Sequence, residues 1–236
     1  MKRGVLYIVW GDQIEPQLQR SIQSVKKYHP AMPIHVERVP DLRERGLLQK
    51  AKMGAITPFE STLYLDADTV LLGNLDDAFQ RGEQFGLACC INECPWLRRY
   101  GSNHGDAIEY NTGVLFFTRQ ARPVFDAWQT LAPVSPAAGR WVTAIDGRLH
   151  GVPCDDQASF ASAVRQAQYC PFILPLNYNF RPVFYPCFFT PLKVWHSPSS
   201  LPEGIEQLNE RTTAGVLPPT YVALQWDGDL PRIARG

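Results

Sequence analysis

Residues 61–75 read STLYLDADTVLLGNL, and their pattern guides the interpretation of the rest of the chain. A short apolar segment typical of a buried strand leads directly into two carboxylates, Asp66 and Asp68. Neighbouring carboxylates beside a core repel each other and lose hydration, so they need a cation or hydrogen-bond donors. Ligands of open α/β sheets bind beyond the carboxyl ends of the strands. The stretch therefore predicts a strand that ends in an acidic ligand site.

Strand-like and helix-like patterns alternate before this stretch. Residues 5–10 are almost entirely apolar, residues 11–29 carry apolar side chains at helical spacing, and residues 34–39 alternate like a second strand. A second helix is expected at 45–56, where Pro58 ends it. With a third strand at 61–65, this order predicts an α/β sheet with right-handed crossovers.

The downstream part of the chain continues the same pattern. Further strands and helices are expected at 75–79 (helix), 85–91 (strand), 112–118 (strand), 122–132 (helix) and 155–167 (helix). Residues 133–151 are rich in Pro, Ala and Gly and predict a loop, and prolines predict an irregular C-terminal part at about 199–236. No repeat or clear linker interrupts residues 1–236, so a single domain is expected.

Composition excludes several classes of protein. Basic and acidic residues balance to a formal net charge of zero, which argues against a general nucleic-acid or membrane-surface binder. The first apolar run is too short for a secretory signal, and no later segment approaches a membrane span. The six cysteines form no CxxC pair, which indicates free thiols in a reducing cytoplasm. A cytoplasmic protein without a transmembrane segment is therefore expected.

Asp66 and Asp68 admit three interpretations. All-oxygen ligation suits Mg²⁺ or Mn²⁺, and such a metal keeps positions open for phosphate oxygens. Alternatively, the pair forms an Asx-type turn that precedes the apolar run 69–75. A third possibility is a phosphatase of the DxDxT type. That motif would require a residue between Asp68 and the threonine, and it follows the first strand rather than the third, so both details count against it.

Five motifs occur in the order LYLDADTVLLGNL (63–75), YNTGVLFF (110–117), DDQASF (155–160), LPLNYNF (174–180) and VWHSP (194–198). With these motifs the chain resembles the glycosyltransferases of GT-A fold, most closely glycosyltransferase family 8, which includes glycogenin and bacterial galactosyltransferases. The resemblance spans roughly residues 4–198. It implies an α/β fold with a mixed, mainly parallel sheet flanked by helices. It also implies transfer of a sugar from a nucleotide-sugar, expected to be UDP-linked, to a hydroxyl of a glycan or other acceptor.

The resemblance also assigns a metal site. Asp66 and Asp68 match the family's DxD motif, which binds Mn²⁺ at the diphosphate of the donor. His196 matches the histidine that completes this site, and an imidazole favours Mn²⁺ over Mg²⁺. Without the resemblance, His196 is a hydrogen-bonded loop histidine.

Other positions match residues around the donor sugar. The resemblance places Asn111 against that sugar and Asp156 and Gln157 near the transferring carbon. The bland alternatives are a strand-entry turn for Asn111 and a helix N-cap for the acidic pair that precedes Gln157. Asn177 falls in the segment that the family places on the acceptor side.

The nucleotide end of the site matches less closely. Asp12 is expected to accept a hydrogen bond from a uracil N–H, or else to cap a helix, and Lys52 is expected near the phosphates, or else on a solvated helix face. The family carries a diphosphate-binding lysine after its histidine, and this chain has none there. Lys52, Lys193 or Arg181 substitutes for it, or the metal alone holds the diphosphate.

The expected mechanism retains the anomeric configuration, as the resemblance implies. The leaving phosphate then accepts the acceptor's proton while Gln157 and Asn111 orient the sugar; in an inverting enzyme Asp156 is the base candidate. Two other functions stay open. A sugar nucleotidyltransferase lacks support because residues 10–17 form no Gly-rich basic loop, and a non-catalytic nucleotide-sugar or glycan-binding module is favoured by the missing lysine. Residues 89–106 are expected to form a loop over the site.

Overall fold

A six-stranded sheet forms the centre of the protein. The computed structural model describes residues 1–40, 43–93, 108–134, 139–142, 149–152, 156–228 and 230–234. The strands of the sheet, in spatial order, are β2 (Ile34–Arg38), β1 (Arg3–Val9), β3 (Ser61–Leu65), β6 (Tyr110–Thr118), β5 (Leu87–Ile91) and β9 (Phe172–Ile173). Only β6 runs against its neighbours, since it pairs antiparallel with both β3 and β5 while the other pairs are parallel. The prediction of a mixed, mainly parallel sheet is confirmed.

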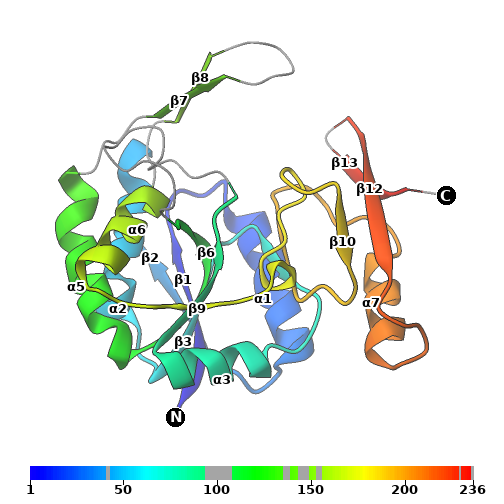
Figure 1. Ribbon diagram of the computed structural model, residues 1–236, viewed down its shortest axis with the longest axis horizontal. Coiled ribbons are helices and arrows are strands. Elements are labelled where there is room, and N and C mark those ends of the chain that lie inside the picture. The colour runs from blue at the N-terminus through cyan, green and yellow to red at the C-terminus, as the bar shows by residue number, and fades with distance from the viewer. Residues whose placement is uncertain are drawn as a thin grey trace.

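Helices cover both faces of this sheet, which explains the unbroken apolar strands. All residues of β3 and β6 are buried, as expected for strands that are packed on two sides. One face carries α1 (Glu15–Tyr28) and α3 (Asp76–Phe85), and the opposite face carries α2 (Met53–Ile56), α5 (Arg122–Leu131) and α6 (Asp156–Gln166) (Figure 1). A separate hydrophobic cluster fills the space on each side of the sheet.

The C-terminal part forms an additional layer beside α1 (Figure 1). Its elements are η4 (Leu176–Tyr178), β10 (Cys187–Phe189), β11 (Val194–His196), α7 (Ile205–Thr213), β12 (Tyr221–Asp227) and β13 (Leu230–Ile233). Strands β10, β12 and β13 form a three-stranded sheet around a third hydrophobic cluster. The expectation of an irregular segment at 199–236 was therefore wrong. Here Gly228, at a φ of 59°, follows Asp227 into the turn of the β12–β13 hairpin, and Asp227 itself pairs with Leu230.

A short two-stranded pairing joins this layer to the acidic stretch. Strand β4 (Thr69–Leu71) follows the two aspartates directly and pairs antiparallel with β11, so that Thr69 lies opposite His196. This pairing brings the first motif (63–75) and the last motif (194–198) of the resemblance together.

Two other expectations need correction. The segment expected as a helix at 45–56 is mostly a 3-10 helix, η1 (Arg43–Lys52), which continues into α2. The expected loop 133–151 contains the antiparallel strands β7 (Gly139–Val142) and β8 (Leu149–Val152), and the short 3-10 helices η2 (Arg119–Ala121) and η3 (Ala132–Val134) flank α5. Most of the predicted loop at 89–106 lies outside the described residues.

Four of the six cysteines lie among the described residues. Cys89, Cys90, Cys170 and Cys187 are free thiols, while Cys94 and Cys154 lie outside the described residues. Among the described helices, none is both long enough and apolar enough to cross a bilayer.

Candidate active site

Asp66, Asp68 and His196 converge at the carboxyl end of β3. The Nε2 atom of His196 lies 3.3 Å from Oδ1 of Asp68 and 3.8 Å from Oδ2 of Asp66. One potential ligand atom from each residue lies within 4.8 Å of the others. Two carboxylate oxygens and one imidazole nitrogen at this spacing suit Mn²⁺, and the three residues fit the divalent metal that the sequence predicts.

Backbone contacts fix this convergence. The backbone N–H of Asp66 donates to the carbonyl of Gly113 on β6 at 2.8 Å, and that of Ser197 donates to the carbonyl of Asp68 at 3.0 Å. Gly113 leaves room for the cluster, because a Cβ at this position would overlap Cε1 of His196 and lie 2.7 Å from Oδ2 of Asp66. A side chain at position 113 would thus fill the space in which the ligands meet.

Asn179 sets the orientation of the histidine ring. Its Oδ1 lies 2.8 Å from Nδ1 of His196. When Nδ1 donates its proton to this oxygen, Nε2 can give up its own proton and offer a lone pair to a cation bound between it and the two carboxylates. The sequence pointed to Asn177 instead. The amide Nδ2 of Asn177 donates to the carbonyl of Pro191 at 3.1 Å, and the residue lines a cavity beside the C-terminal sheet.

The state of Asp68 also suits a ligand. Burial is the largest effect and raises the pKa of this carboxyl, but His196, Lys50 and a backbone hydrogen bond together lower the pKa to about 2. Asp68 is therefore an anion at neutral pH and is available to a cation.

A buried lysine links the candidate metal site to Asp156. The ammonium of Lys50, whose side chain is 3% exposed, lies 2.8 Å from Oδ1 of Asp66 and 3.0 Å from Oδ2 of Asp156. Tyr64 donates to Oδ1 of Asp66 at 2.8 Å, and Thr112 donates to Oδ2 of Asp156 at 2.6 Å. Burial lowers the pKa of Lys50, but the two carboxylates outweigh it and the net shift is upward. The lysine thus remains charged.

Lys50 was missed in the sequence, where Lys52 was expected. Lys52 is exposed, whereas Lys50 and Leu47 both line the cleft beside the aspartates. A 3-10 helix repeats every three residues, so positions 47 and 50 share a face that position 52 leaves.

The other predicted residues are placed as follows. Asn111 is buried, and its side-chain oxygen accepts a hydrogen bond from the backbone of Gly113 at 2.9 Å. Asp156 and Gln157 form the first turn of α6, with Asp156 buried and Gln157 partly exposed. Asp12 is exposed, and α1 begins without a side-chain cap, so the structure gives Asp12 no capping role.

A cleft of about 380 Å³ opens beside the cluster. It is bounded by the end of β1, the start of α1, η1 and the segment after His196, with lining residues Ile8, Val9, Trp10, Ile14, Gln17, Leu47, Lys50, Asp66, Ala67, Asp68 and Pro198. An aromatic and apolar side therefore faces an acidic side, as a nucleotide bound to a metal requires.

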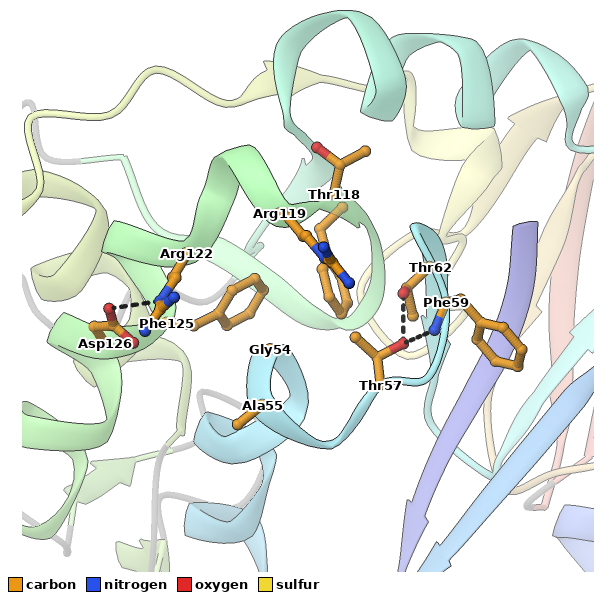
Figure 2. Close-up of a pocket in the computed structure, with 11 residues that line it drawn as sticks. Gly54, Ala55, Thr57, Phe59, Thr62, Thr118, Arg119, Arg122, Phe125 and Asp126 are labelled. Atoms are coloured by element: carbon orange, nitrogen blue, oxygen red, sulfur yellow. Dashed lines mark hydrogen bonds and ion pairs between the residues drawn. The ribbon is translucent and has the colours of Figure 1, made fainter. Parts of the chain in front are cut away.

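A larger cavity, of about 520 Å³, lies near the start of β3, between α2 and α5 (Figure 2). Arg119 and Arg122 are at its rim, and the hydroxyls of Thr57 and Thr62 contact each other at 2.7 Å. Its lining contains one acidic residue, Asp126, which lies 3.4 Å from Nε of Arg122. The metal-ligand set, rather than cavity size, therefore locates the candidate active site.

Comparison with known proteins supports the same fold. No family model and no curated protein matches the chain. Among solved structures, it is similar to the galactosyltransferase LgtC in complex with donor and acceptor sugar analogs, with a TM-score of 0.53 and 16% identity over 92% of this chain and 97% of LgtC. It is also similar to mouse xyloside xylosyltransferase 1, with a TM-score of 0.53 and 11% identity over 83% of this chain and 97% of that protein.

The glycosyltransferase GlyE of Streptococcus pneumoniae is a third similar structure, with a TM-score of 0.53 and 14% identity over 91% of this chain and 64% of GlyE. The chain has the fold of GT-A glycosyltransferases. The fold that the motifs predicted is confirmed. At these identities the likeness establishes the fold, and the activity must be argued from the site.

Proposed function

We propose that this protein is a metal-dependent glycosyltransferase that moves a sugar from a nucleotide-sugar, UDP-linked, to an acceptor hydroxyl. The observation that carries the proposal is the meeting of Asp66, Asp68 and His196 beside a cleft at the carboxyl edge of a GT-A sheet. Similar structures support it, since one is named a xylosyltransferase and another is a galactosyltransferase in complex with donor and acceptor sugar analogs.

The metal ligands suggest how departure of the nucleotide is assisted. Asp66, Asp68 and His196 would hold Mn²⁺, which supplies Lewis-acid stabilisation of negative charge on a leaving diphosphate. Asn179 keeps Nε2 of His196 available, and Lys50 neutralises Asp66 until a metal binds.

The surroundings of Asp156 favour retention over inversion. An inverting enzyme needs a base, and Asp156 would have to take up a proton while its Oδ2 accepts from both Lys50 and Thr112. Protonation there would break an ion pair in a buried site. A fixed Asp156 is better suited to hold hydroxyls of the donor sugar, with Gln157 beside it on α6 and Asn111 on β6.

The test is a panel of nucleotide-sugars incubated with Mn²⁺, with slow donor hydrolysis as the readout. UDP-sugars are expected to be hydrolysed, and the double variant Asp66→Asn, Asp68→Asn is expected to lose both hydrolysis and Mn²⁺-dependent UDP binding. Asp126→Asn, an acid in the other cavity, serves as the control and should match the wild type.

The panel, together with a pyrophosphate-release assay, separates the competing functions. Donor binding without hydrolysis or transfer would indicate a binding module, and release of pyrophosphate from a nucleoside triphosphate and a sugar 1-phosphate would indicate a nucleotidyltransferase. NMR of the product decides the stereochemistry: a β-linked product from an α-linked donor would overturn retention.

A further inference from the structure

Arg20 on α1 carries a positive charge beside the metal cluster. Its Nη2 donates to the carbonyl of Ser197 at 3.1 Å, and its Nη1 donates to the carbonyl of Ser199 at 3.2 Å. Within the described part of the chain, these acceptors are neutral and the buried Nε of Arg20 has no hydrogen-bond partner. The guanidinium is thus bound to the segment that carries the cleft residue Pro198, through backbone carbonyls and not through a carboxylate.

The segment that Arg20 holds is part of the wall of the cleft. Ser197 and Ser199 bond to each other through their hydroxyls at 2.6 Å, and Pro198 between them lines the cleft together with Gln17. Gln17 and Arg20 lie three residues apart on α1, so they share one side of the helix. Burial lowers the pKa of Arg20 and Asp68 opposes this shift, which puts the guanidinium within electrostatic reach of a metal ligand.

Charge balance shows why a further cation is useful. Asp66, Asp68 and Asp156 contribute three negative charges, and Lys50 contributes one positive charge. A bound divalent cation brings the sum to zero. A nucleoside diphosphate leaving from this site carries about three more negative charges at neutral pH, and Lys50 is already shared by two carboxylates.

The basic residues expected from sequence do not supply this charge. Lys52 is exposed and leaves the face of η1 that carries the cleft residues Leu47 and Lys50. Arg181 is 3.1 Å from the buried carboxylate of Glu93. Lys193 precedes β11 at the end away from His196, with its side chain against Gly73.

We propose that Arg20 is the cation that stabilises the donor's diphosphate, delivered from α1 rather than from the segment that follows His196. The inference rests on the proposed function, because it takes a nucleoside diphosphate as the leaving group. It assigns Arg20 two linked tasks: its Nη atoms hold Ser197 and Ser199, and its charge acts on the phosphates beside them.

The experiment compares ligands that differ only in phosphate. Binding of UDP and uridine, each with saturating Mn²⁺, is measured by calorimetry and by saturation-transfer NMR for the wild type, Arg20→Gln and Arg20→Lys. Arg119→Gln, at the larger cavity near the start of β3, is the matched control. Mn²⁺ binding by electron paramagnetic resonance and thermal unfolding verify that each variant is folded and keeps its metal.

Arg20→Gln is expected to weaken UDP about tenfold or more, the usual contribution of a charged contact, with uridine unchanged. Arg20→Lys keeps the charge but cannot make both backbone hydrogen bonds, so it should weaken UDP less than Arg20→Gln does. Equal UDP affinity in Arg20→Gln and wild type would overturn the proposal. Equal losses of UDP and uridine in both variants would also overturn it, because they indicate a purely structural clamp. If the wild type does not bind UDP at all, both the role of Arg20 and the proposed glycosyltransferase function are refuted.

Discussion

Replacing Lys50 with methionine removes one positive charge from between two carboxylates and keeps most of the side chain's volume. At an effective dielectric constant of about 20, unit charges at 2.8 and 3.0 Å, the separations found here, attract by about 6 kcal/mol each. The cost of burying the ammonium offsets much of this attraction, and removal of one partner from a buried ion pair costs about 3–5 kcal/mol overall. We therefore expect Lys50→Met to lower the free energy of unfolding by about 3–5 kcal/mol.

Urea denaturation followed by tryptophan fluorescence, in buffer with a chelator, measures this loss. Lys52→Met is the matched control, since it removes the same charge from an exposed position two residues away. That variant should change the free energy of unfolding by no more than about 0.5 kcal/mol. A loss below about 1 kcal/mol for Lys50→Met would refute the view that Lys50 neutralises Asp66 and Asp156.

Two further variants test the metal cluster. Gly113→Ala is expected to weaken Mn²⁺ binding at least about tenfold, because its Cβ would occupy the space of His196 and Asp66; Gly73→Ala, whose Cβ would meet only the flexible end of a lysine at 3.2 Å, should leave Mn²⁺ affinity unchanged. Asn179→Ala is expected to reduce Mn²⁺ affinity about 10- to 100-fold by releasing the ring of His196. Electron paramagnetic resonance measures both effects, and wild-type affinity in either variant would contradict the corresponding contact.

The sequence predicted the three residues of the candidate metal site but not the residues that hold them in place. Asp66 and Asp68 follow a strand whose apolar pattern is plain, and His196 was found through the resemblance. Lys50 was not predicted because lysine side chains are rarely buried. Asn179 was not predicted because nothing in LPLNYNF shows which asparagine faces the histidine. In the structure it is Asn179, whose Oδ1 lies 2.8 Å from Nδ1 of His196.

The C-terminal layer was predictable only in part. Its strands are short and its prolines are many, which hides the strand pattern. The glycine at position 228, which follows Asp227 where the chain turns, is a turn signal that was available in the sequence. The pairing of β4 with β11 was not available, because it joins segments far apart in the chain and depends on the whole layer packing beside α1.

That pairing has a consequence for how the protein becomes active during synthesis. The two aspartates belong to the first third of the chain, while the histidine opposite Thr69 belongs to the last fifth. A nascent chain that ends before His196 lacks the imidazole, and the candidate site can form only after β11 has been made and has paired with β4. Premature termination upstream of β11 would remove Val194 as well, a member of the buried cluster on the α1 side of the sheet, so the same strand completes both the core and the candidate site.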